Sequence, residues 1–149
     1  MPSSLPSGAT NLKEILSSLQ TTLHPATFVF LTFPPSASEP PGTLFQQMSL
    51  RESEGLTVIT TLESAEQHGL DYLFPCRMIT CEVHTSLEGV GFMAVISDVL
   101  AKKNMGVNPV SGFFHDHLFV PLGREEEAVA ALGDLAASAR KELLSTERI

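Results

Sequence analysis

The clearest hydrophobic pattern along the chain lies in its C-terminal half. Apolar and polar residues alternate over residues 79–83, which predicts a strand with one buried face. From 88 to 104 apolar residues recur every three or four positions in a broad stripe, which predicts a helix lying on a sheet. Two strands are then predicted at 107–114 and 118–121, and a helix is predicted at 124–146. This half therefore has the order strand, helix, strand, strand, helix.

The first of these helices carries signals at both ends. Thr85-Ser86-Leu87-Glu88 has the spacing of a capping box, in which the threonine oxygen accepts a hydrogen bond from an amide of the first turn. Asn104 and Gly106 tolerate the left-handed conformation that commonly ends a helix. The last two strands flank His115-Asp116-His117, where Asp116 is a favourable turn residue.

The N-terminal half predicts the order helix, strand, strand, strand, helix. Its first helix follows a cap at Thr10 or Asn11 and ends at His24-Pro25, because the residue before a proline avoids the helical region. Residues 28–33 are apolar on both faces, as in an interior strand covered on both sides. A proline-rich loop follows at 34–42, and then a hairpin whose two strands are 44–51 and 56–61. A short helix at 63–68 is closed by Gly69. The connection 70–75 contains apolar residues, so the halves should pack together, and shared strands are compatible with this pattern.

Composition narrows the class of protein. With 149 residues and 43% apolar content, the chain can form one compact unit or two small ones that share a core. The net charge of -8 argues against a surface for nucleic acid or anionic membrane, and it is compatible with a cationic or zwitterionic ligand. The N-terminus lacks a signal pattern and no segment is long and apolar enough to span a membrane, so we expect a cytoplasmic protein.

The two cysteines support that expectation. Cys76 and Cys81 are five residues apart on one predicted strand, so their side chains point to opposite faces and cannot bridge each other. Unpaired cysteines are typical of a reducing compartment. Cys81 lies near His84 in sequence but on the opposite strand face, which indicates a core residue and not a nucleophile.

The stretches SLEGVGFMAVIS and GFFHDHLFVP resemble the signature segments of the ACT domain family, in particular of small stand-alone proteins with two tandem ACT units. LHPATFVFLTFP and EGLTVI extend the resemblance from about Leu12 over most of the chain. It implies an α+β fold of two ferredoxin-like units packed together. We assign residues 1–10 to a flexible tail, 11–72 to the first unit and 73–149 to the second.

The resemblance also implies a ligand site at the connection between strand and helix, with a contribution from the neighbouring strand. Carried over, the ligand-binding residues are Ser86, Leu87, Glu88, Gly89, Val90, Gly91 and Asn108. A second site is implied at Glu54, Gly55, Leu56 and Thr57. In the alternative interpretation these residues only cap a helix, allow close packing and form a turn.

One departure from the family pattern affects the first of these sites. Asn108 is followed by Pro109, and proline has no backbone donor, so this strand should be an edge strand or locally bulged. Phe113-Phe114 stands where the family commonly has two tyrosines.

Two other chemistries are indicated only weakly. Gly89-Val90-Gly91-Phe92-Met93-Ala94 has the outline of a dinucleotide-binding turn, but no acidic residue follows at the next strand. His115 and His117, with Asp116, could contribute to a metal site, although they form a thin ligand set in a turn. We therefore expect no cofactor and no metal.

The expected function is a regulatory or sensor module that binds an amino acid or a similar zwitterion and acts in trans. Such a module is not an enzyme; it should form a homodimer and can act on a regulated protein partner, with no role in nucleic-acid or membrane binding. Two alternatives stay open at this point: a metal-dependent enzyme that uses the His-Asp-His turn, and a protein-interaction module without a ligand.

Overall fold

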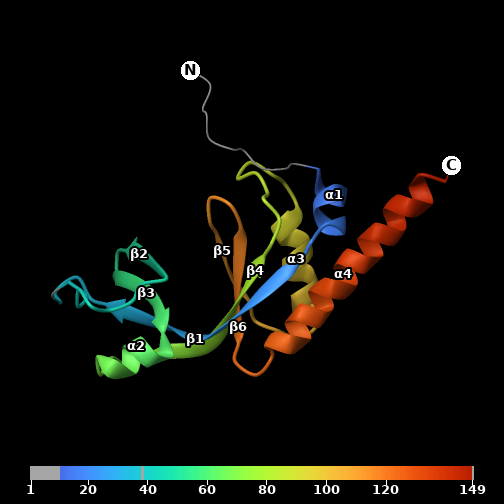
Figure 1. The fold of residues 1–149 in the computed structure, drawn as a ribbon. Coiled ribbons are helices and arrows are strands. Elements are labelled where there is room, and N and C mark those ends of the chain that lie inside the picture. Colours follow the sequence, from blue (N-terminus) through green and yellow to red (C-terminus); the bar gives the residue numbers. More distant parts are fainter. Residues whose placement is uncertain (1–10, 38, 149) are drawn as a thin grey trace, which may run out of the picture.

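The computed structural model describes residues 11–37 and 39–148, so the expected tail at 1–10 lies outside the described residues. In chain order the elements are α1 (Leu12–Ser17), β1 (Thr21–Phe33), β2 (Met48–Glu52), β3 (Gly55–Thr61), α2 (Leu62–Gln67), β4 (Leu73–Cys81), α3 (Phe92–Ala101), β5 (Asn108–Ser111), β6 (Asp116–Pro121) and α4 (Glu125–Thr146). The element orders predicted for both halves are confirmed (Figure 1).

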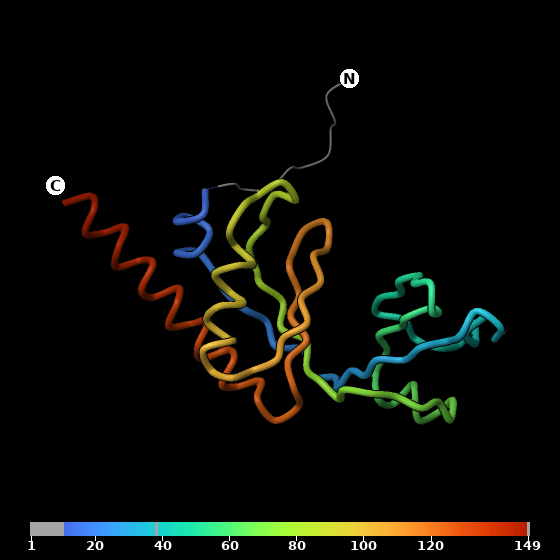
Figure 2. Tube along the Cα trace, turned by 180° about the vertical axis from the view of Figure 1, so that it is seen from behind, coloured from blue at the N-terminus to red at the C-terminus, as the bar shows by residue number. Residues whose placement is uncertain are grey.

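All strands of both halves join one antiparallel sheet with the order β2-β3-β1-β4-β6-β5. The two long central strands, β1 and β4, run antiparallel between two lobes, as the trace in Figure 2 shows. They take part in two overlapping four-stranded units, β2-β3-β1-β4 and β1-β4-β6-β5. Each unit has the strand order of a ferredoxin-like fold, so the predicted α+β class is confirmed and the central pair is common to both units.

The two units differ in the segment after their first strand. In the second unit β4 leads through residues 82–91 into α3, and the helix crosses back to β5. In the first unit β1 leads through residues 34–47 to β2, and no helix forms over the described part of that segment. Prolines at 34, 35, 40 and 41 explain this difference, because proline removes the amide donors that helix turns need.

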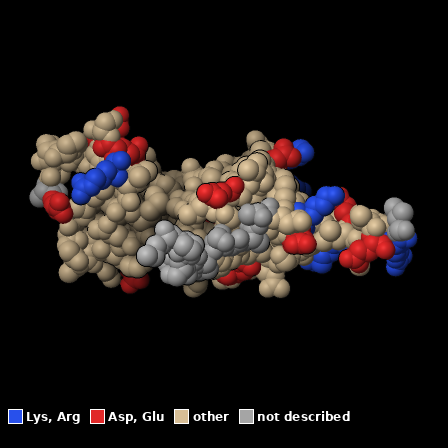
Figure 3. All heavy atoms as spheres, turned by 90° about the horizontal axis from the view of Figure 1, so that it is seen from above, with Lys and Arg blue, Asp and Glu red and all other residues tan. Residues whose placement is uncertain are grey.

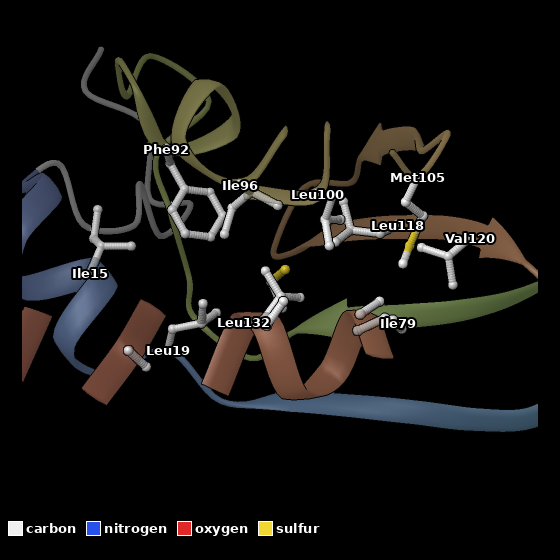
Figure 4. Close-up of a cluster of buried hydrophobic side chains, with 14 residues drawn as sticks. Ile15, Leu19, Ile79, Phe92, Ile96, Leu100, Met105, Leu118, Val120 and Leu132 are labelled. Carbon is white, nitrogen blue, oxygen red and sulfur yellow. The ribbon is translucent and has the colours of Figure 1, made fainter. Parts of the chain in front are cut away.

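The largest core lies between the sheet and helices α1, α3 and α4 (Figure 4). Ile79 and Leu118 from the sheet meet Ile96 from α3 and Leu132 from α4, and all four are fully buried. A second cluster beneath α2 contains Val29, Val58 and Ala65. Helix α1 belongs to the large core, because its Ile15 is buried against the second unit although the helix begins the chain.

A third cluster occupies the sheet face that carries no helix among the described residues. Phe119 of β6 makes edge-to-face contacts with Phe28 and Phe30 of β1, at 5.8 Å between ring centroids in each case. Met78 and Cys76 of β4 complete this cluster. Cys76 and Cys81 therefore lie in different clusters on opposite faces and both thiols are free, as the sequence predicts.

The predicted end of the first helix is wrong. Helix α1, capped as expected by the Asn11 side chain, already ends at Ser17, and His24-Pro25 lies within β1. The register between β1 and β4 shifts between Leu23 and Thr27, so the proline occupies a bulge where no ladder hydrogen bond is needed. Arg77 donates two hydrogen bonds to the His24 carbonyl and one to Glu125, which holds this irregular backbone in place.

Three further local predictions are also corrected. Helix α3 begins at Phe92, not at Glu88, and its N-cap is Gly91 with no side-chain cap, so Thr85 and Glu88 do not form a capping box. Strand β2 begins at Met48, because Leu44 is instead buried in the loop beneath α2. Asp116 is not a turn residue: it begins β6 and is buried.

Other local predictions are confirmed. Gly69, at φ +62°, follows α2, and Asn104, at φ +52°, follows α3, each in the left-handed region. Strand β5 with Pro109 is an edge strand, as the missing donor predicts.

Candidate functional site

Residues 82–91, which we call the elbow, connect β4 to α3. The Gly89 amide donates to the Ser86 carbonyl at 2.9 Å, and the Glu88 amide donates to the Ser86 hydroxyl at 3.1 Å. These bonds close a tight turn, and Gly91 at φ +97° redirects the chain into the helix. The elbow is thus a preformed loop whose apolar Leu87 and Val90 side chains are exposed to solvent.

The elbow covers a cavity of about 110 Å³, which we call the elbow cavity. Its walls come from the elbow, α1, the start of α3 and the end of β5. The lining residues are Leu12, Ile15, Thr85, Ser86, Leu87, Gly89, Val90, Phe92, Met93, Ser111, Gly112 and Asp116. Asp116 is the only acidic or basic residue among these described lining residues, so the cavity combines apolar walls and hydroxyl groups with a single carboxyl group.

The Asp116 carboxylate is held in place by two hydroxyl groups. Ser111 donates to Oδ1 at 2.5 Å and Thr85 donates to Oδ2 at 3.2 Å. Asp116 is 7% exposed, and the described residues that line the cavity include no lysine or arginine. A buried carboxylate that accepts only from neutral donors has no countercharge in the described structure, and this favours a cationic group in the cavity.

The structure brings together part of the predicted site. Ser86, Leu87, Gly89 and Val90 line the elbow cavity. Glu88 and Gly91 belong to the elbow but not to the lining, and Asn108 pairs with Phe119 at the far end of β5.

Sequence reasoning missed Asp116, Ser111 and the two residues of α1, Leu12 and Ile15. A signal for Asp116 exists in the sequence, because it alternates with the core residues Leu118 and Val120 and must share their face. No such signal exists for α1, which is far away in the chain.

A second polar cluster lies on the opposite face of the same strands. His24 Nε2 lies 2.8 Å from the Thr80 hydroxyl, and His117 Nδ1 lies 2.9 Å from the same oxygen. One hydroxyl therefore links β1, β4 and β6, and because it carries one proton it donates to only one of the two imidazoles. The pKa of His117 is lowered by burial and, to a smaller extent, by the neighbouring His115 and His24.

The side chains of His115, Asp116 and His117 do not converge. Asp116 pairs with Cys81 and faces the helices, whereas His117 pairs with Thr80 and faces away from them. His115 Nε2 lies 3.7 Å from a Glu82 carboxylate oxygen. Within residues 11–37 and 39–148, no three His, Cys, Asp or Glu side chains are grouped so that they could hold a metal ion.

The segment that follows β1 forms a different hollow, of about 270 Å³, which we call the proline hollow. The proline-rich loop forms one wall, and the β2–β3 hairpin forms the other with Arg51 and Glu52. Of the second predicted site, Gly55 and Leu56 line this hollow. Glu54 is exposed and its pKa is lowered by a hydrogen bond from Ser53, and Thr57 donates to Glu52 instead.

Neither cysteine is suited to nucleophilic chemistry. Burial raises the pKa of Cys76 and of Cys81 to about 12, so both remain thiols at neutral pH. The sequence-based assignment of Cys81 to the core is confirmed.

Comparison with known proteins agrees with this architecture. Residues 7–77 and residues 74–134 each match a profile of the ACT domain. A crystal structure of a Vibrio cholerae protein of unknown function, described as a possible transport protein, is similar at 34% identity and a TM-score of 0.75, and the match covers 84% of this chain and 95% of that one.

Two more distant structures share the fold. An Agrobacterium tumefaciens protein is 16% identical with a TM-score of 0.66, over 79% of this chain and 89% of that one. The aspartokinase alpha and beta subunits give 12% identity and a TM-score of 0.55, over 77% of this chain and 95% of that one. No protein of curated function matches the chain.

The helices in the described part of the chain do not combine the length and hydrophobicity that crossing a membrane requires. Seen from above, the visible basic side chains lie toward the two ends of the molecule, whereas acidic side chains also appear between them (Figure 3).

Proposed function

The chain belongs to the ACT-domain family, and on that premise we propose that it is a regulatory module whose elbow cavity binds a small zwitterion such as an amino acid. ACT domains are generally regulatory modules that bind small molecules. The proposal adds the class of ligand and the place where it binds.

The buried carboxylate of Asp116 is the observation that supports this proposal most strongly. Each carboxylate oxygen accepts one hydroxyl proton, and each has a second lone pair with which it can accept a proton from an ammonium group. An ammonium group of the ligand would replace the missing countercharge and form charge-assisted hydrogen bonds. The Thr85 and Ser86 hydroxyls and the elbow backbone stand around the cavity to receive the polar remainder of the ligand.

The size of the cavity limits the ligand. A volume of about 110 Å³ corresponds to about four water molecules at roughly 30 Å³ each. A small amino acid fits this space, whereas the side chain of a large one would extend past Leu87 and Val90 into solvent. We therefore expect the tightest binding for zwitterions with short side chains.

The test is a thermal-shift and calorimetric screen of the full chain against the twenty amino acids, with simple amines and carboxylates as partial ligands. At a concentration one hundred times its Kd, a ligand that binds only the folded state stabilises it by about 2.7 kcal/mol. We expect a dose-dependent rise in Tm with small amino acids, and a smaller rise with the corresponding amines. Amino acids that leave the Tm unchanged at millimolar concentration would contradict the proposal.

Two variants locate the site. Leu87→Ala removes an exposed side chain from the rim and should weaken binding several-fold without unfolding the protein. Leu144→Ala, at a leucine on α4 that is also exposed, is the matched control and should leave the affinity unchanged. Asp116→Asn should abolish the preference for an ammonium group, provided that circular dichroism shows an intact fold.

We further propose that the module acts in trans, as a homodimer or on a protein partner. ACT domains generally oligomerise, and β2 and β5 are edge strands with backbone groups that could pair with another chain. Light scattering with and without the ligand tests this part of the proposal. A monomer under both conditions, with no partner captured, would contradict it.

A further inference from the structure

A groove of about 460 Å³ opens where the link between α2 and β4 meets the sheet. We call it the tyrosine groove; its lining residues are Phe30, Leu31, Thr32, Thr57, Asp71, Tyr72 and Leu73. None of these residues lines the elbow cavity or the proline hollow. Its volume lies in the range of small-molecule sites, about 300–1,000 Å³.

The base of the tyrosine groove is the helix-free face of the sheet. Phe30 pairs with Ile59 on one side and Leu73 on the other, and Thr32 pairs with Thr57, so these side chains form adjacent rows on one face. Leu73 is 77% exposed and Tyr72 is 38% exposed. Large apolar side chains left open to solvent beside a concave surface indicate a binding site more often than chance.

The base of the groove is apolar and aromatic. The Phe30 ring packs edge-to-face on Phe74 at 5.7 Å and on Phe119 at 5.8 Å between centroids. The Tyr72 side chain lies at the side of the groove. A hydrocarbon body bound between these rings would remove their surface, and that of Leu73, from water.

The charges around the groove have one sign. Among the described lining residues Asp71 is the only acidic one, and none is a lysine or arginine. A second carboxylate lies beside the groove, because the lining residue Thr57 donates its hydroxyl proton to Glu52. Aromatic faces also attract cations, so the rings and the carboxylates favour the same charge in a ligand.

We propose that the tyrosine groove binds a small organic cation with an apolar body, such as a primary amine on a cyclic or branched hydrocarbon. The hydrocarbon packs on Phe30, Tyr72 and Leu73, and the ammonium group faces Asp71. This site is separate from the elbow cavity and does not depend on the ligand proposed there.

The chain provides its own probe for this site. Tyr72 is the only tyrosine and the chain contains no tryptophan, so intrinsic fluorescence reports on the groove and not on the elbow. The titration uses cyclohexylmethylamine, with neutral cyclohexylmethanol and anionic cyclohexanecarboxylate as probes of similar shape. We expect a saturable change in Tyr72 emission and an affinity order of amine, alcohol, carboxylate, with the amine about five- to tenfold tighter than the alcohol.

Substitutions separate charge recognition from simple apolar binding. Asp71→Asn should remove most of the preference for the amine over the alcohol, with the remainder due to the rings, and should leave the affinity for the alcohol unchanged. Asp134→Asn, an exposed aspartate on α4, is the matched control and should change neither. Leu87→Ala, at the elbow, should also change neither, so a failure of the elbow proposal can be told apart from a failure of this one.

The proposal is overturned if the amine leaves Tyr72 emission unchanged, or if amine and alcohol bind equally well. It is also overturned if Asp71→Asn keeps the full preference for the amine. Because Asp71 lies at the surface in a linker, this variant is expected to fold, and circular dichroism checks that it does.

Discussion

The elbow after β4 and the proline-rich segment after β1 occupy corresponding positions in the two units, yet they have become different structures. The elbow leads into α3 and encloses a cavity of about 110 Å³ around a buried carboxylate. The proline-rich segment forms no helix over its described residues and borders a hollow of about 270 Å³ with Arg51 and Glu52 at its wall. The two sites therefore differ in volume and in the charged residues that line them.

This difference shows that the sheet order of the first unit does not require a helix between β1 and β2 over the described residues. The first unit lacks the crossover helix, but β2 still pairs with β3, and β3 still pairs with β1, in the same antiparallel arrangement. Leu44 enters the core beneath α2 from the loop and takes part in the packing that a helix would otherwise provide. The first unit thus keeps all four strands of its sheet without a helix in the described segment between β1 and β2, and the proline hollow lies beside that segment.

The largest effect is expected for Gly55, which begins β3 and borders the proline hollow. A Cβ atom there would lie 2.4 Å from the Phe33 carbonyl oxygen, and the residue has φ +153°. Because the obstacle is backbone, Gly55→Ala should cost about 2 kcal/mol or more of unfolding free energy. Urea denaturation measures this loss.

Alanine substitutions at two other glycines provide a comparison for the cost at Gly55. Gly91→Ala, in the elbow, should cost less, about 1 kcal/mol, because its Cβ meets only the flexible Leu12 side chain at 3.2 Å and the remaining cost is the positive φ. Gly42→Ala has no atom within 4 Å of the added Cβ and should be nearly neutral. A smaller cost at Gly55 than at Gly91 would show that the hairpin shifts easily, and that the first unit is the softer of the two.

An intermediate effect is expected from two threonines that both donate to a carboxylate. Thr85→Val removes a donor from the buried Asp116 and should cost about 1–2 kcal/mol. Thr57→Val removes a donor from the exposed Glu52 and should cost less than about 0.5 kcal/mol, because water replaces the lost hydrogen bond. Equal losses in chemical denaturation would mean that Asp116 is more accessible to water than its burial indicates.

The smallest effect is a pH dependence that arises from His117 in the second unit. The folded state holds the pKa of His117 below its ordinary value of 6.5, through burial and through His115 and His24, against the opposing influence of Asp116 and Glu82. The unfolded chain therefore binds the proton more readily, and stability is lost as the pH falls below about 6.5 through the folded pKa. The free energy of unfolding should be measured by denaturation between about pH 7.5 and pH 5.

His117→Gln should make that pH dependence shallower, because it removes the titrating group from the link to Thr80 and His24. His68→Gln, which removes a histidine from the first unit, should leave the part that depends on His117 in place. A slope that is unchanged in the His117 variant would assign the pH dependence to other groups.

Much of the fold could be predicted from local patterns. The caps and stops at Asn11, Gly69 and Asn104 appear where predicted, because each depends on the backbone preferences of one or two residues. The failures occurred where a distant contact overrides a local preference. Pro25 is accommodated in a bulge that Arg77 holds in place, and Thr85 donates to Asp116 instead of capping a helix.

The sequence by itself determined the order of helices and strands, the opposite orientation of the two cysteines and the edge position of Pro109. These features follow from periodicity and from the chemistry of single residues. Only the tertiary structure decided that β1 and β4 serve both units, that α1 closes a cavity of the opposite unit and that Asp116 lies at its base. These features depend on contacts between residues far apart in the chain, and local sequence patterns do not predict such contacts.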